Sequence, residues 1–183
     1  IAVAGNYVYV ADGYSGLVIV DITDSSSPTT FGIYDGIIDA LDVAISGNYA
    51  YVADGYSGLV ILDISDPAAP TLVGSYETAD YGYVPTRNIA VAGNYAYLTN
   101  AAGLVIVDIT DPSAPTLAGS YYIPYVWNVA VSGNYAYLAA DDLLIVDISD
   151  PSSPILAGSY NTAGYAIGVI ASGDYAYVAD GEN

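Results

Sequence analysis

The sequence predicts an all-β protein built from repeated antiparallel units. Three observations predict this class. Short phrases return along the chain at intervals of about 40 residues. Within the phrases, apolar side chains alternate or form short continuous runs, as in β-strands, and no stretch shows the helical apolar period. Glycines, Asp-Gly pairs and Asp-Pro pairs separate the runs, as turns between strands require.

The first two strands of each unit flank a glycine. The phrase Gly-Asn-Tyr-x-Tyr begins at Gly5, Gly47, Gly93 and Gly133, and it returns at Gly173 with aspartate in place of asparagine. These glycines are 42, 46, 40 and 40 residues apart. A short apolar run before the glycine predicts the first strand. The Tyr-x-Tyr segment predicts the second, with both tyrosines on one face because side chains alternate along a strand.

The third and fourth strands follow in the same order in every complete unit. The third is Leu-Val-Ile-Val-Asp or a close variant, at residues 17–21, 59–63, 104–108 and 143–147. It is apolar on both faces, which predicts a strand that is covered on both sides. Asp-Gly pairs before this strand and Asp-Pro pairs after it supply the turns. The fourth strand is predicted within residues 28–34, 70–76, 115–121 and 154–160.

Four strands in a unit of roughly 40–45 residues is the spacing of β-propeller blades. The predicted fold is therefore all-β, a β-propeller of four-stranded antiparallel blades with four complete repeats and half of a fifth. One repeat array, 1–183, is expected, with blades at approximately 1–42, 43–88, 89–128, 129–168 and, in part, 169–183. Both ends fall inside the pattern, so we expect an excerpt of a longer chain. The alternatives are a ring closed between chains and an open arc that stacks end to end.

These phrases carry a family resemblance. Leu-Val-Ile-Val-Asp, followed by Ile-Thr/Ser-Asp-Pro and then by Pro-Thr-Leu-x-Gly-Ser-Tyr, resembles the LVIVD repeat. The first unit departs from it, with Asp24-Ser25 in place of Asp-Pro. The resemblance covers essentially the whole chain. It implies a β-propeller fold and a surface or secreted protein of bacteria or archaea, and it implies no sharply defined activity.

The charge balance excludes several classes of function. Twenty acidic residues stand against one basic residue, Arg87, for a net charge of −19. Phosphate backbones and anionic lipid heads repel such a chain, so we expect no nucleic-acid partner. Without cysteine or histidine, thiol nucleophiles, haem ligation and ordinary zinc sites are excluded. No apolar run reaches the ~20 residues of a membrane span, so no membrane insertion is expected.

Candidate binding residues lie in the loops between blades, where the units differ. The only arginine and the only tryptophan occupy equivalent positions, six residues before their repeat glycines, which predicts that both stand at the mouth of the central channel. Aromatic side chains beside amides and carboxylates predict a sugar or peptide pocket. The alternative is that Arg87 pairs with a neighbouring aspartate and Trp127 packs under its own loop. The predicted ligand-binding residues are Asp42, Tyr81, Tyr83, Arg87, Asn88, Tyr125, Trp127, Asn128 and Tyr165.

Two repeated residue types have a structural and a functional interpretation. The Tyr-x-Tyr pairs account for ten of the 21 tyrosines, and packing between blades is favoured over a stacking surface. The aspartates that flank the turn after the third strand are predicted to cap turn amides. No cofactor is expected. Calcium is the alternative for crowded carboxylates such as Asp141-Asp142.

The function predicted is a non-enzymatic scaffold at the cell surface or outside the cell, for adhesion or surface assembly through self-association. Its expected partners are further copies, other surface proteins or glycans. A propeller that binds a glycan or peptide through its inter-blade loops is the first alternative. The second is a glycoside hydrolase or lyase that uses two carboxylates, for which Asp39, Asp42 and Asp80 are the candidates.

Overall fold

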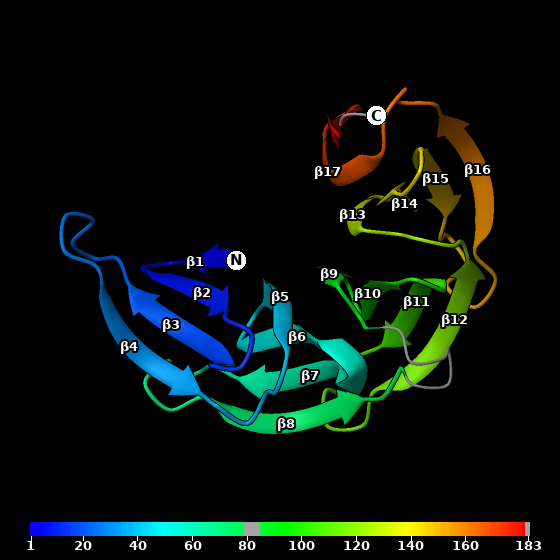
Figure 1. The fold of residues 1–183 in the computed structure, drawn as a ribbon. Helices are drawn as coiled ribbons and strands as arrows, with labels where there is room; N and C mark the ends of the chain where they lie inside the picture. The colour runs from blue at the N-terminus through cyan, green and yellow to red at the C-terminus, as the bar shows by residue number, and fades with distance from the viewer. Residues whose placement is uncertain (79–84, 182–183) are drawn as a thin grey trace.

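The computed structural model describes residues 1–78 and 85–181. Within them the chain forms four four-stranded antiparallel sheets and one two-stranded sheet, which confirms a propeller fold with four complete blades and part of a fifth. The sheets stand side by side in an arc, with the first strand of each nearest the common centre (Figure 1). In these residues no helix combines the length and apolar character that crossing a membrane requires.

Every blade follows the chain order from the centre outward. The innermost strands are β1 (Ala2–Ala4), β5 (Ala40–Ser46), β9 (Asn88–Ala92), β13 (Asn128–Ser132) and β17 (Ala166–Ser172). The second strands are β2 (Tyr7–Ala11), β6 (Tyr49–Asp54), β10 (Tyr95–Asn100), β14 (Tyr135–Ala139) and β18 (Tyr175–Asp180). The third strands are β3 (Leu17–Asp21), β7 (Gly58–Asp63), β11 (Gly103–Asp108) and β15 (Leu143–Asp147). The outer strands are β4 (Thr29–Tyr34), β8 (Thr71–Tyr76), β12 (Thr116–Tyr122) and β16 (Ile155–Tyr160).

The turns follow the predicted chemistry. The glycine that opens each Gly-Asn or Gly-Asp pair has a φ of 57–58°, a value that only glycine adopts without strain. A glycine at the first central position of a two-residue hairpin is the signature of a type II′ turn. Gly13 and Gly55 of the Asp-Gly pairs also have positive φ, and Gly55 is the first residue of a short 3-10 turn, η1 (Gly55–Ser57).

The hydrophobic cores lie between neighbouring blades. On β7, Leu59 and Ile61 join the core shared with the third blade. The alternate residues Val60 and Leu62 join the core shared with the first blade. The same division recurs on β11, where Leu104 and Ile106 face the fourth blade. The third strand is therefore apolar on both sides because each of its faces belongs to a different core.

The tyrosine pairs support packing between blades. The second tyrosine of the first three pairs is almost completely buried, at Tyr9, Tyr51 and Tyr97. Burial, and secondarily the charge of the other tyrosine in the pair, raises the pKa of these three hydroxyls above its ordinary value. In the two-stranded fifth sheet the equivalent Tyr177 is exposed. The difference arises because each of the three buried tyrosines packs in the core shared with the following sheet, and no described sheet follows the fifth.

Glycines of the outer strands receive the Asp-Pro turn of the following blade. Each outer strand carries a bulge just before its glycine. A Cβ at Gly32 would lie 2.1 Å from the carbonyl oxygen of Pro67, and one at Gly74 would lie 2.3 Å from that of Pro112. Gly119 meets the carbonyl of Pro151 in the same way. The repeated glycine is therefore needed for close contact between blades.

The repeated aspartates cap turns, as predicted. At the end of β3, Asp21 accepts a 2.8 Å hydrogen bond from the Thr23 amide, and the same bond recurs in the other complete blades. Asp24 caps the next turn in the same manner. Hydrogen bonds from the side chain and amide two residues later lower the pKa of both carboxyls. The turn between the third and outer strands is thus fixed by two carboxylates.

We predict that Gly74→Ala destabilises the protein by about 1–3 kcal/mol, since overpacking at a close contact has that cost. The added methyl would collide with the Pro112 carbonyl. Gly158→Ala is the matched control, because its Cβ would meet nothing within 4 Å. Urea denaturation of both variants gives the two free energies of unfolding. Equal values for the two variants would contradict the contact.

We also predict an acid-sensitive contribution from the turn aspartates. Folding lowers the pKa of these carboxyls from its ordinary value of 3.8. Each such carboxyl stabilises the fold when the pH is above 3.8, and this stabilisation is lost as the pH falls through 3.8 and below. In the Asp63→Asn/Asp108→Asn variant the cap oxygen remains but no longer titrates. Its free energy of unfolding should therefore fall less on acidification.

The control for this comparison is Asp35→Asn/Asp174→Asn, which removes the same charge from exposed positions. It corrects for the repulsion that protonation relieves in a chain of net charge −19. Chemical denaturation between pH 3 and 7 measures all three proteins, a range that brackets the ordinary carboxyl pKa. An equal decline in both variants would show that the caps contribute nothing to the pH dependence.

Candidate functional site

Loops of two kinds meet on one face of the arc, which we call the loop face. They are the turns between second and third strands and the segments between blades. The Gly13 amide donates to the carbonyl of Ala40, at the start of the next blade, over 2.9 Å. In the next blade the Thr86 amide donates to Gly55 over 2.7 Å. The loop face therefore brings together the most variable segments of the sequence, as predicted.

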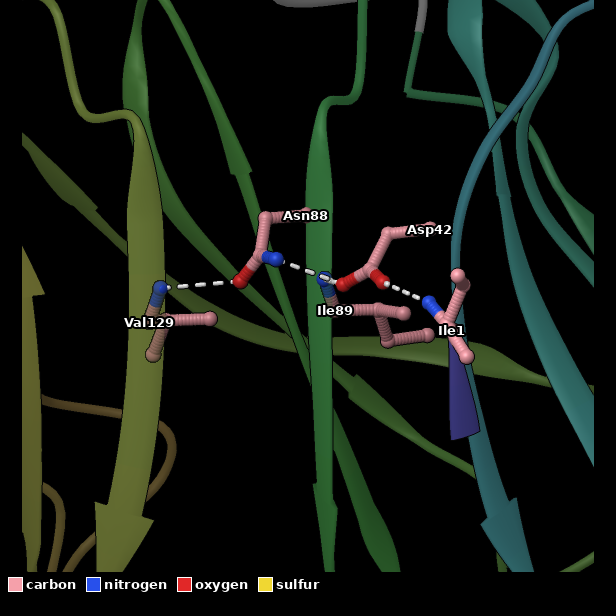
Figure 2. A network of polar contacts seen from close by, with 5 residues as sticks. All are labelled: Ile1, Asp42, Asn88, Ile89 and Val129. Carbon is pink, nitrogen blue, oxygen red and sulfur yellow. Dashed lines mark hydrogen bonds and ion pairs between the residues drawn. The ribbon is translucent and has the colours of Figure 1, made fainter. Parts of the chain in front are cut away.

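A chain of hydrogen bonds joins the innermost strands of successive blades. Asp42 accepts bonds from the Asn88 side chain and from the Ile89 amide. Asn88 Oδ1 in turn accepts from the Val129 amide over 2.9 Å (Figure 2). The bond recurs one blade later, from the Val169 amide to Asn128 Oδ1 over 3.0 Å. We call this set the inner-strand ladder.

The inner-strand ladder occupies three of the residues predicted to bind a ligand. Asp42, Asn88 and Asn128 all lie five residues before a repeat glycine, and each directs a side-chain oxygen at the next blade. The terminal amine of Ile1 lies 3.6 Å from the other carboxylate oxygen of Asp42. These side chains thus hold neighbouring blades in register.

Arg87 and Trp127 stand together at the loop face. The guanidinium carbon of Arg87 lies 4.9 Å from the centre of the Trp127 ring, within the range of a cation–π contact. Among the described residues, Arg87 forms no ion pair with a carboxylate. The structure therefore brings these two predicted residues together from adjacent blades.

The segment between β12 and β13 presents Tyr125 and Trp127 to solvent. Two of its side chains, Ile123 and Val126, are buried in the core between the third and fourth blades. Tyr125 remains 62% exposed and Trp127 40% exposed. The φ of Tyr125 is +60°, a left-handed conformation that costs about 1–2 kcal/mol in a residue other than glycine. The buried neighbours hold the segment in this strained form.

Two cavities share Tyr125 and Trp127. The smaller, of about 140 Å³, also contacts Arg87, Ala101 and Val126. The larger, of about 360 Å³, is lined by Tyr125, Trp127, Asp141, Tyr165 and Ile167, and we call it the Trp127 cavity. The sequence predicts Tyr165 as a binding residue, whereas it indicates Asp141 only as one of two crowded carboxylates. Asp141 lies in the turn between β14 and β15, and the position of such turns on the loop face is the sequence signal for its place near the cavity.

Other predicted residues lie apart from this cavity. Tyr81, Tyr83 and Asp80 fall outside the described residues. Asp39 lies in the segment before β5, and its amide donates to the buried carboxylate of Asp54 over 2.9 Å. Within residues 1–78 and 85–181, no three acidic side chains converge as a metal site would require.

Comparison with known families adds one assignment. The family model described as LVIVD repeat matches residues 1–36, 39–78, 85–122, 124–162 and 163–183. The five matches correspond to the five sheets. No curated protein matches the chain.

Solved structures share the fold at low identity. A functionally unknown protein from Desulfotomaculum acetoxidans is 16% identical, with a TM-score of 0.79 over 98% of this chain and 61% of its own. A proposed 6-phosphogluconolactonase from Bacteroides fragilis is 13% identical, with a TM-score of 0.76 over 94% of this chain and 59% of its own. A chain of a nidogen–laminin complex is 13% identical, with a TM-score of 0.71 over 96% of this chain and 68% of its own. The chain thus spans less than two thirds of the first two proteins, and the likeness establishes the fold alone.

We predict that Asn128→Ala lowers the free energy of unfolding by about 0.5–1.5 kcal/mol, the net contribution of a hydrogen bond. The variant removes the acceptor of the Val169 amide. Asn128→Asp keeps an acceptor oxygen, as Asp42 does at the equivalent position, and is expected to stay close to the original stability. Denaturant titration distinguishes them. Two variants of equal stability would argue against the ladder bond.

Proposed function

The chain belongs to the LVIVD repeat family, and from this premise we propose that it is a non-enzymatic scaffold outside the cell that acts in adhesion. Its loop face binds a glycan or peptide of a surface partner. The observation that carries this proposal is the pair of adjoining cavities around Trp127. Aromatic walls with few polar groups are typical of a binding site for a small ligand or a peptide segment.

The division between framework and loops supports binding. Sheet cores, turn aspartates and outer glycines recur from blade to blade. The aromatic side chains of the Trp127 cavity come instead from segments that differ between blades. Tyr125 keeps a strained backbone there, and such strain is concentrated at functional sites.

The use made of the carboxylates supports a role without catalysis. A glycosidase needs two carboxyl groups free to act across a bond. Asp42 is occupied by the inner-strand ladder, where it accepts bonds from the Asn88 side chain and the Ile89 amide. The chain also has no histidine or lysine with which a general acid or base could be tuned. A location outside the cell is supported by the absence of lysine and by the abundance of tyrosine and glycine.

We predict that a glycan or peptide from a surface-derived panel shifts the fluorescence of Trp127, the only tryptophan. Trp127→Ala lacks the fluorophore, so calorimetry measures its affinity for the ligand. This affinity should fall at least tenfold, because truncation of an aromatic anchor residue typically has such an effect. Tyr14→Ala is the control, because Tyr14 is an exposed aromatic residue on the first blade. It should bind like the original protein.

A flat response across the panel would contradict binding through the loop face. Light scattering of the same samples follows self-association. Ordered assemblies that form equally well in Trp127→Ala would leave assembly between copies as the function.

A further inference from the structure

The Trp127 cavity has a composition that points to one class of ligand. Its lining consists of the aromatic rings of Tyr125, Trp127 and Tyr165, the aliphatic side chain of Ile167 and the carboxylate of Asp141. No basic side chain and no amide side chain contributes to this lining. An anion would find no positive partner in the cavity. Of the two ligands in the proposed function, a peptide suits this lining better than a glycan, because one carboxylate and no amide side chain is available to orient sugar hydroxyls.

Aromatic faces and a carboxylate together attract cations. The face of an aromatic ring carries partial negative charge, and tryptophan is the strongest of these rings. A quaternary or methylated ammonium group suits such walls, because its methyl groups pack on the rings while its charge is diffuse and weakly hydrated. A volume of about 360 Å³ exceeds what a trimethylammonium head needs and leaves room for the chain attached to it.

The protein already places one cation on this tryptophan. Arg87 lies over the Trp127 ring, with 4.9 Å between its guanidinium carbon and the ring centre. Arg87, Trp127 and Ile167 occupy equivalent positions in three successive blades, so the tryptophan lies between the other two. Arg87 thus reaches the ring from the preceding blade, whereas Tyr165 and Ile167 of the Trp127 cavity come from the segment that leads into the following one.

The charge of the whole chain favours the same ligand. A net charge of −19 raises the local concentration of cations near the surface. Arg87, the one basic side chain, opposes a second cation nearby, but it is exposed to solvent and outside the lining of the Trp127 cavity. The carboxylate of Asp141 belongs to that lining.

We propose that the Trp127 cavity binds a quaternary or methylated ammonium group, held by Tyr125, Trp127 and Tyr165 and neutralised by Asp141. The inference rests on the proposed function, since it names the ligand class of the same loop face. The ammonium group belongs either to a small free molecule or to a methylated lysine of a partner peptide.

Isothermal calorimetry with choline chloride, against sodium chloride at equal ionic strength, tests the inference. 3,3-Dimethylbutanol is the matched probe, because it has the shape of choline without the charge. We expect it to bind at least about two- to fivefold more weakly, because it lacks the exposed cation–π contact and also the charge pair with Asp141. A peptide with one trimethyllysine is titrated beside its unmodified form. Preference for this peptide over choline assigns the ligand to a partner protein, and preference for choline assigns it to a small molecule.

Three variants separate the contributions. Asp141→Asn should weaken choline binding up to about fivefold, the loss of one exposed charge pair. Arg87→Gln should bind choline as well as the original protein or better, because it removes a repelling charge. Trp127→Ala should lose binding, while its circular dichroism and urea midpoint report whether it is folded. Tyr125→Phe keeps the aromatic ring and should retain choline binding. This variant tests the role of the rings even if Trp127→Ala fails to fold.

The inference is overturned if dimethylbutanol binds as tightly as choline, or if Arg87→Gln abolishes binding. It is also overturned if no ammonium probe binds while a neutral glycan still depends on Trp127, and in that case the proposed function stands. If no ligand of any class binds at Trp127, both the inference and the proposed function fail.

Discussion

Packing of each sheet against the next is the interaction on which the rest of this fold depends. The third strand supplies residues to two cores, so neither face of a complete blade between two neighbours is left to solvent. Two further contacts fix how far apart the blades stand. At the periphery a proline carbonyl approaches the glycine of the preceding blade. At the centre, Asp42, Asn88 and Asn128 bond the amides of the following blade.

The contacts that recur between the blades come from the repeated framework, and the loop face adds local contacts such as the Gly13–Ala40 bond and the Arg87–Trp127 pair. The segments between blades vary around this framework. The segment that carries Tyr125 and Trp127 is anchored from beneath by Ile123 and Val126. Its two large rings therefore remain exposed on a fixed support. Because the rings are already in place, little conformational entropy is lost when a ligand binds.

Much of the fold could be predicted because the same sequence pattern occurs in each repeat unit. Strand order, turn glycines and turn aspartates each follow from local chemistry and agree between units. The site was less predictable because side chains at the channel mouth have two plausible partners. Asn88 is equally suited to a ligand and to the amide of Val129, and only the distance between blades decides. The repeat pattern places Asp141 in a turn of the loop face, but its share in the Trp127 cavity depends on how that turn packs beside the neighbouring segments.

The innermost strands fix the blades to one another through the inner-strand ladder. Amide hydrogen exchange, followed by NMR, measures this directly at Ile89, Val129 and Val169, the three donors of the inner-strand ladder. Val91 and Val131 are the references. Each lies two residues after a donor on the same strand, so its amide points the same way but makes no bond of the inner-strand ladder. We expect the three donors to exchange at least tenfold more slowly than these references, which corresponds to about 1.4 kcal/mol. Equal rates would contradict the ladder.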